Sequence, residues 1–185
     1  MKKQSKLTTR CVYAALAMTG LCLTGVAFAA EPSPAPKADA KKGMPAPMDS
    51  KDRDFMMEAA KANMEEVEMG KMAEQKGQSA DVKKFGQTMV TDHSKANGEL
   101  MALASKKGVK LDTSHKMKEN MGGANFDQEY LADMVKDHQK DIAAFESEAK
   151  NGMDPDVKSW AGKTLPTLKK HLKMAQDAQG KIKKS

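Results

Sequence analysis

Three of the four histidines lie where a helix would turn them toward one side. His93, His138 and His171 each fall on a stripe of apolar residues spaced by three and four positions, and Glu66 holds the equivalent place in a fourth segment. Asp141 follows His138 by about one helical turn and could join them. Imidazoles and a carboxylate together suit zinc, iron, manganese or copper. One hypothesis from this pattern is therefore a transition-metal site formed by Glu66, His93, His138, Asp141 and His171.

The same histidines also have a simpler interpretation. A buried imidazole is usually hydrogen-bonded to a carboxylate or a backbone group, and such a network needs no metal. Asp92 and Asp137, which directly precede two of the histidines, are rotated from them by about 100° on a helix and are expected to face the surface. A purely structural polar interior is the first interpretation, a mononuclear metal site the second, and catalysis the third.

The spacing argues against a di-iron centre. Ferritin-like di-iron proteins carry a Glu-x-x-His motif on two helices. In this chain, the residues three positions before the inner histidines are Val90, Val135 and Leu168. Carboxylate-bridged iron, with its ferroxidase or oxygenase chemistry, is therefore not expected.

A second candidate site lies in a polar segment between the predicted helices. His115, Met117 and Met121 offer one imidazole and two thioethers, which are ligands for Cu(I). Lys116 and Lys118 oppose a cation there, because they place positive charge beside it. On the apolar stripes methionine is instead expected to fill gaps in the core, at Met69, Met89 and Met134.

Four helices must position these side chains. The composition, rich in good helix formers and only 4% aromatic, favours an all-α fold. Turn residues divide the periodic part into helices expected over residues 52–76, 80–106, 126–150 and from 155 onward. Measured from the connecting turns, Glu66 and the inner histidines lie within roughly 5 Å of one height. A four-helix bundle would therefore bring them to one level.

The predicted helix ends rest on a few residues. Ser50 or Asp52 is expected to cap the first helix, and Asp154 with Pro155 opens the fourth. Pro166 lies well inside the fourth helix and is expected to kink or loosen it.

The two halves of the bundle match at an offset of 75 residues. This shift aligns the turn at 77–79 with the turn at 152–154, Val82 with Val157, and Phe85 with Trp160. We infer a duplicated helical hairpin joined by a longer crossover, because one hairpin alone cannot bury its inner stripe.

The N-terminal residues predict export. Residues 1–29 have a basic start, an apolar stretch and the small-x-small motif Ala27-Phe28-Ala29, as in a cleaved signal peptide. Both cysteines, Cys11 and Cys22, lie within it. A flexible linker rich in Pro, Ala and Lys is expected over residues 30–50 and the bundle over 51–183. The mature protein is expected to be periplasmic or secreted and to lack a membrane span.

Several segments resemble a known family. They are residues 66–73 (EVEMGKMA), 89–93 (MVTDH), 126–130 (FDQEY) and 165–172 (LPTLKKHL), and they are similar in order and spacing to the exported bacterial family called domain of unknown function 4142. The resemblance extends from about residue 52 to 181. It implies a ferritin-like bundle in the cell envelope and no established activity.

Three hypotheses for function follow. The first is a non-enzymatic bundle that binds an unidentified envelope partner or contributes to stress tolerance. The second is a bundle that binds or buffers a transition metal at the five residues above. The third is a metal-dependent redox enzyme. Nucleic acid is not an expected partner, because much of the net charge of +6 comes from the signal peptide and export separates the protein from it. The sequence gives no indication of the oligomeric state.

Overall fold

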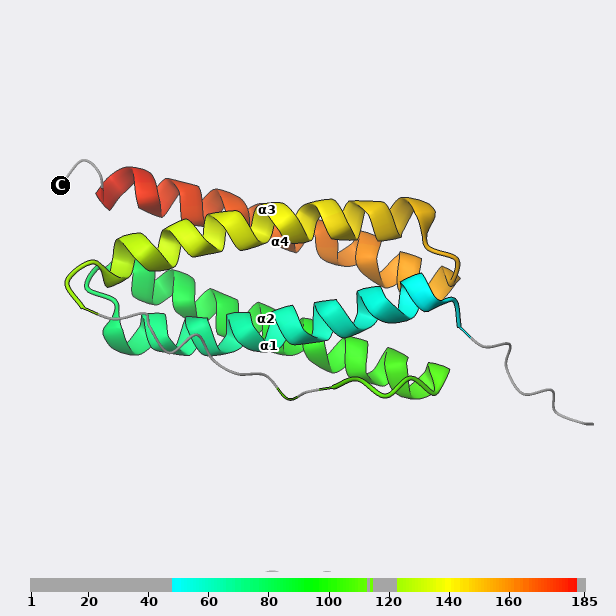
Figure 1. Cartoon of the computed structure of the whole chain (residues 1–185). Coiled ribbons are helices and arrows are strands. Elements are labelled where there is room, and N and C mark those ends of the chain that lie inside the picture. The colour runs from blue at the N-terminus through cyan, green and yellow to red at the C-terminus, as the bar shows by residue number, and fades with distance from the viewer. Residues whose placement is uncertain (1–47, 113, 115–122, 183–185) are drawn as a thin grey trace, which may run out of the picture. The chain divides into compact units, whose positions relative to one another are not determined.

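Four long helices make up most of the described part of the chain (Figure 1). The computed structural model describes residues 48–112, 114 and 123–182, so the predicted signal peptide, most of the linker and the His115–Met117–Met121 segment lie outside it. The helices are α1 (Ser50–Lys76), α2 (Ala80–Lys107), α3 (Phe126–Asn151) and α4 (Pro155–Ile182). The predicted all-α four-helix bundle is confirmed. None of these helices combines the length and apolar character needed to cross a membrane.

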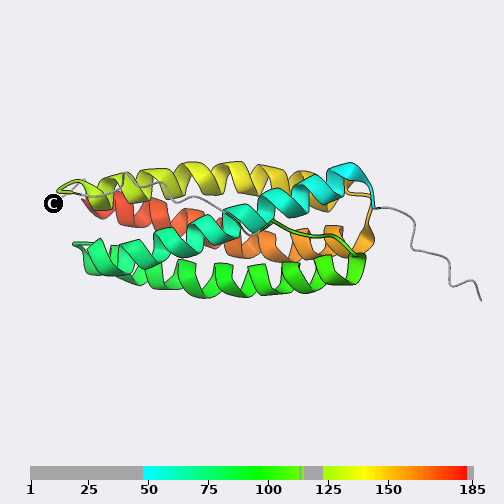
Figure 2. The same cartoon turned by 60° about the horizontal axis from the view of Figure 1, so that its bottom comes forward.

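The helices pair as two hairpins, α1 with α2 and α3 with α4, which lie side by side along a common length (Figure 2). Polar caps fix several ends. The Ser79 hydroxyl accepts a hydrogen bond from the Val82 amide, and Gly108 ends α2 in the left-handed region at a φ of 68°. Asp154 accepts from the Val157 amide and opens α4 with Pro155, as expected. Helix α4 runs on through Pro166.

The predicted cap of α1 was wrong. Its helix begins at Ser50, and Asp49 caps it by accepting a hydrogen bond from the Lys51 amide. Asp52 lies inside the helix, where it is buried and faces the other hairpin. Its carboxylate accepts from the backbone amides of Met153 and Asp154 at 3.0 and 2.6 Å.

The opposite end of the bundle repeats this contact at the offset of 75 residues. Asp127, at the start of α3, accepts from the amides of Gln78 and Ser79 at 2.9 and 2.8 Å. Each hairpin therefore caps the turn of the other with an aspartate in its first helix. This reciprocity is the physical counterpart of the repeat inferred from the sequence.

Replacing Asp127 by alanine is expected to lower the free energy of unfolding by about 1.5–3 kcal/mol, because it leaves two backbone donors of the α1–α2 turn without a charged acceptor. Chemical denaturation measures the difference. Glu129, exposed in the same helical turn, provides the control, since Glu129→Ala should change stability by only a few tenths of a kcal/mol. Equal effects of the two substitutions would show that the turn does not depend on Asp127.

Helices α1 and α2 approach each other closely at two glycines, Gly70 and Gly86. A Cβ on Gly70 would lie 2.7 Å from the carbonyl oxygen of Gly86, and a Cβ on Gly86 would lie 2.6 Å from that of Gly70. Gly70→Ala is therefore expected to lower the free energy of unfolding by about 1–3 kcal/mol. Gly98→Ala should raise it by about 0.5–1 kcal/mol, because nothing lies within 4 Å of its new methyl group. Thermal unfolding of both variants measures this contrast, and destabilisation of equal size would contradict it.

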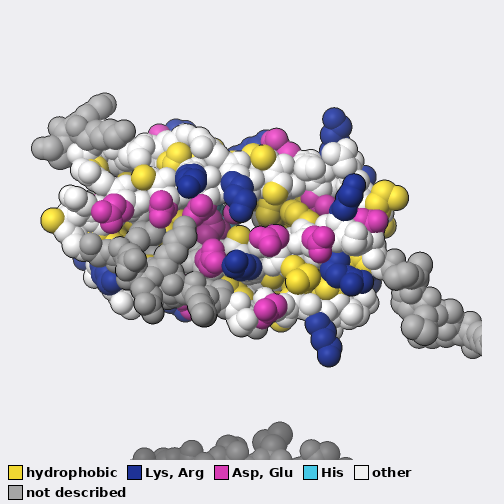
Figure 3. Space-filling view, in the orientation of Figure 1, with side chains coloured by type: hydrophobic (Ala, Val, Ile, Leu, Met, Phe, Trp, Pro, Cys, Tyr) yellow, Lys and Arg dark blue, Asp and Glu magenta, His cyan; other side chains and the backbone are white. Residues whose placement is uncertain are grey.

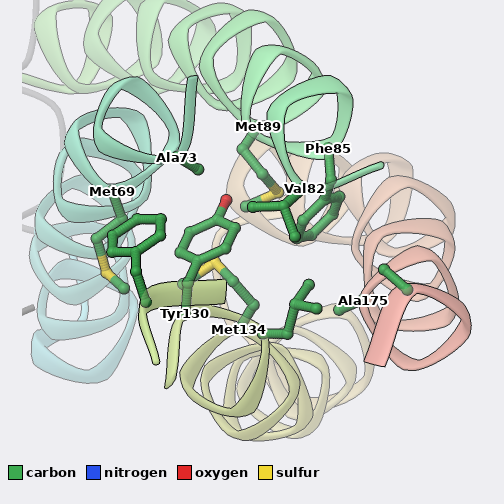
Figure 4. Packing of buried hydrophobic residues seen from close by; sticks show 11 residues of the cluster. Met69, Ala73, Val82, Phe85, Met89, Tyr130, Met134 and Ala175 are labelled. Atoms are coloured by element: carbon green, nitrogen blue, oxygen red, sulfur yellow. The ribbon is translucent and has the colours of Figure 1, made fainter. Parts of the chain in front are cut away.

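The apolar core is divided into two clusters. One contains Phe85, Met89, Tyr130 and Met134 (Figure 4), and the other contains Leu100, Phe145 and Trp160. On every helix the residues of the predicted site lie between the positions that enter these clusters. The clusters thus enclose a polar layer halfway along the bundle.

Candidate metal centre

The polar layer receives one or two side chains from every helix. Its buried members are Asn63 and Glu66 on α1, His93 on α2, His138 on α3 and His171 on α4. The three histidines are 2%, 0% and 0% exposed, so water reaches none of them freely. Their burial follows from the stripe spacing seen in the sequence, which turns each one inward.

One nitrogen of each histidine points into a common centre. Nε2 of His93 lies 3.2 Å from Nδ1 of His171, and Nε2 of His138 lies 3.4 Å from the same atom. One ligand nitrogen from each ring lies within 4.8 Å of the other two. Two nitrogens bound to one tetrahedral metal at about 2.0–2.1 Å are separated by roughly 3.3 Å. The spacing of this histidine triad therefore suits a single ion.

The hydrogen-bond acceptor on the outer side of each imidazole decides which of the two ring nitrogens carries the proton. Nδ1 of His138 lies 2.9 Å from the Met134 carbonyl oxygen, which can only accept, so Nδ1 carries the proton. Nε2 of His171 lies 2.9 Å from a carboxylate oxygen of Asp92 and carries the proton for the same reason. Nδ1 of His93 donates to the side-chain oxygen of Asn63 at 2.9 Å. The inward nitrogen of each ring is therefore unprotonated, and the three lone pairs face one another.

Converging lone pairs repel unless a positive charge lies between them. One proton can bridge two of the nitrogens but not all three. Burial also lowers the pKa of His93 and of His171 to about 4, so both rings are neutral near pH 7. Neutral, outwardly anchored imidazoles are the form in which histidine binds metals.

Glu66 lies behind the rings rather than at the centre. Its two oxygens approach Nδ1 of His93 at 2.8 Å and Nδ1 of His138 at 3.3 Å, which is the outer side of both imidazoles. Neither oxygen accepts a well-aligned hydrogen bond from the described residues. Burial raises the pKa of this carboxyl to about 7, although the nearby His138 lowers it. Glu66 is placed to balance the charge of an ion in the triad.

The two aspartates of this layer differ from their sequence-based expectations. Asp92 was expected to face the surface, but its carboxylate contacts His171 while remaining partly exposed. The side chain reaches back over the α2–α4 interface because the two helices pack together. Asp141 was placed among the ligands, yet it forms no hydrogen bond or ion pair with the described residues. It lines a cavity between α1 and α3, where burial and the Glu66 charge raise its pKa to about 7.

Two members of the layer were missed from the sequence. Asn63 corresponds to His138 at the 75-residue offset, so the repeat pointed to it. The Met134 carbonyl belongs to the preceding helical turn, and a backbone acceptor leaves no signal in the sequence. Both orient an imidazole from outside.

The family profile named Domain of unknown function (DUF4142) matches residues 36–178. The chain belongs to the DUF4142 family. No functionally curated protein shows significant similarity to it. The family name carries no activity, so the chemistry must be inferred from the polar layer.

Solved structures of the same fold include metal-bound ones. A DUF305 fragment from Deinococcus radiodurans has a TM-score of 0.65 at 10% identity, covering 73% of this chain and 99% of that one. CopM in its Cu(II)-bound form has a TM-score of 0.62 at 16% identity, covering 71% and 97%. CopM in its Cu(I)-bound form gives 0.61 at 18%, covering 68% and 93%. These similarities agree with the ferritin-like helical bundle implied for this DUF4142 member and show the fold alone.

Proposed function

We propose that this DUF4142 bundle binds one transition-metal ion, with copper as the preferred metal, through Nε2 of His93, Nε2 of His138 and Nδ1 of His171. The observation that carries the proposal is the convergence of three lone pairs whose rings are anchored from outside. Anchoring of this kind is typical of metal-bound histidines, whose second nitrogen donates to a carboxylate or carbonyl group.

The ligand set disfavours manganese among the four metals considered from the sequence. Imidazole suits copper, zinc and iron, whereas manganese prefers carboxylate and water. Copper binds most tightly at a given nitrogen site in the Irving–Williams order. CopM, which shares the fold, is described as bound to Cu(I), Cu(II) and silver, and this supports the same choice.

Closure of the site favours binding over catalysis. A catalytic metal keeps an open position for water or substrate. Here every histidine ligand is at most 2% exposed, and the apolar clusters lie on both sides of the layer. We therefore propose that the protein stores or buffers metal, in the exported compartment expected from its signal sequence, rather than acting as a redox enzyme.

Metal analysis of the mature protein, purified without chelator, tests the proposal together with calorimetric titration of copper and zinc. We expect one copper ion per chain in the wild type and none at this site in a His93→Ala, His138→Ala double variant. His115→Ala is the control for the alternative Cu(I) segment and should bind as the wild type does. Equal and negligible uptake by the wild type and the double variant would overturn the proposal and favour a metal-free structural interior.

A further inference from the structure

A surface cavity reaches the polar layer between α2 and α4. Its volume is about 270 Å³. Its lining residues are Asp92, Lys95, Ala96, Glu99, Lys163, Thr164 and Thr167. Asp92 belongs both to this cavity and to the surroundings of the triad, because its carboxylate oxygen lies 2.9 Å from Nε2 of His171.

Asp92 differs from the other groups that hold the histidines. Asn63, Glu66 and Met134 are all buried, whereas the Asp92 side chain is 30% exposed. Among the described residues it is thus the one anchor of the triad that also reaches solvent. A cavity between α1 and α3 lies at the face shown in Figure 3, but it touches the layer only through Asp141, which holds no histidine.

Helix α4 is weakened where it forms the cavity wall. Pro166 lies between the lining residues Thr164 and Thr167, and it has no backbone N–H to donate to the carbonyl oxygen of Gly162. One hydrogen bond of the helix is therefore missing about one turn before His171. A wall lacking that bond deforms at lower cost than an intact helix.

We propose that copper passes between solvent and the buried triad through this α2–α4 cavity, with Asp92 as the first ligand it meets and His171 as the second. This inference rests on the proposed copper site. The Asp92 carboxylate would hold copper at the Nε2 edge of His171, and the ion would then pass this edge to reach the Nδ1 lone pair on the inner side of the ring. The proton on Nε2 would stay with His171, so each exchange of ligands would displace only water.

The charges at the rim of the α2–α4 cavity nearly cancel, so they do not attract copper from a distance. Lys95 and Lys163 stand beside Asp92 and Glu99, so the rim carries two charges of each sign. Copper is therefore not concentrated there by a long-range field, and the loading rate should depend little on salt. The contact between Asp92 and His171 distinguishes this opening from the rest of the surface.

A pair of matched substitutions tests the route. Ala96→Leu narrows the α2–α4 cavity, and Ala62→Leu narrows the α1–α3 cavity, and both alanines are half-buried helical residues. Stopped-flow mixing with Cu(II), followed by capture with a chromophoric chelator, gives the loading and release rates. We expect Ala96→Leu to slow both rates by roughly tenfold or more and to leave the dissociation constant unchanged, because a blocked passage affects both directions equally. Ala62→Leu should load and release copper as the wild type does.

The outcomes separate the route from the site. Wild-type rates in Ala96→Leu, or equal slowing in Ala62→Leu, would overturn the route while leaving the copper site intact. Failure of the wild type to take up copper would overturn the site and the route with it. The loading rate of an Asp92→Asn variant provides a second test, since this substitution keeps the shape of the cavity and removes the carboxylate that copper meets first. Loading of this variant should be slower than loading of Asp141→Asn.

Discussion

A His171→Leu variant is expected to bind copper more than about 100-fold more weakly than the wild type, a larger loss than that of an outer-shell partner, while its metal-free fold remains equally stable. His171 supplies the nitrogen that the other two rings both approach, so its loss leaves only two ligands. Leucine has a similar volume and removes the facing lone pairs, so the metal-free core gains apolar packing as it loses the contact with Asp92. Competition with a chelator measures affinity, and chemical denaturation measures stability.

The same variant separates the metal site from a structural network. If the histidines served only to hold the helices together, His171→Leu would lower the free energy of unfolding by about 1–3 kcal/mol, because the buried groups that contact His171 would lose their hydrogen-bond partner. His115→Leu is the matched control and should leave affinity and stability unchanged. Loss of stability in His171→Leu without loss of copper affinity would contradict our account.

A Glu66→Gln variant is expected to weaken copper binding by about 10–100-fold and to stabilise the metal-free protein at the same time. The amide keeps the size of the side chain and removes the negative charge behind His93 and His138. Without metal, that charge is buried and lacks a well-aligned hydrogen-bond donor, so holding it lowers stability. Opposite signs for affinity and stability are therefore the expected signature.

The gain in stability should depend on pH. Burial raises the pKa of Glu66 from its ordinary value of 4.5 to about 7, so the folded protein retains this proton over a range in which the unfolded chain has lost it. The free energy of unfolding that Glu66 contributes therefore falls as pH rises from 4.5 to 7 and stays low above it. Glu66→Gln should equal the wild type near pH 4 and exceed it by up to about 3 kcal/mol near pH 8.

Glu65 provides the control for this prediction. It precedes Glu66 on α1 but lines the α1–α3 cavity, where it is only half-buried. Glu65→Gln should leave copper affinity near that of the wild type and should alter the pH dependence of unfolding far less than Glu66→Gln, because the Glu65 charge makes only a small contribution to the raised pKa of Glu66. A Glu66→Gln variant that is less stable than the wild type at both pH extremes would show that this carboxylate supports the fold directly.

Most of the fold was predictable because local signals agreed along the chain. The stripes of three and four, the turns at 77–79 and 152–154 and the repeat of 75 residues all indicated paired hairpins, and the reciprocal contacts of Asp52 and Asp127 follow that repeat. The cap of α1 was missed because Asp49, Ser50 and Asp52 all have side chains suited to capping. Only the packing of the second hairpin showed that Asp52 serves the distant turn.

The positions of the histidines in the site could be predicted from the sequence, but the positions of the carboxylates relative to the rings could not. Helical spacing decides whether a side chain points inward, and this placed Glu66, His93, His138 and His171 in one layer. It does not decide which side of an imidazole a carboxylate approaches, so Glu66 was expected at the centre but lies behind the rings. Its position on α2, considered alone, predicted that Asp92 faces solvent. Asp92 contacts His171 because α4 packs against α2 at this level, which the helical spacing does not indicate.

X-ray absorption spectroscopy of the mature protein loaded with one equivalent of copper identifies the atoms that bind the ion. A copper ion held by the three histidines should give a first shell of nitrogen scatterers with the outer-shell pattern of imidazole rings, and this pattern should weaken in His171→Leu. The same spectrum should be obtained from His115→Leu. A first shell dominated by sulfur, or a spectrum that His171→Leu leaves unchanged, would contradict a copper ion held by His93, His138 and His171.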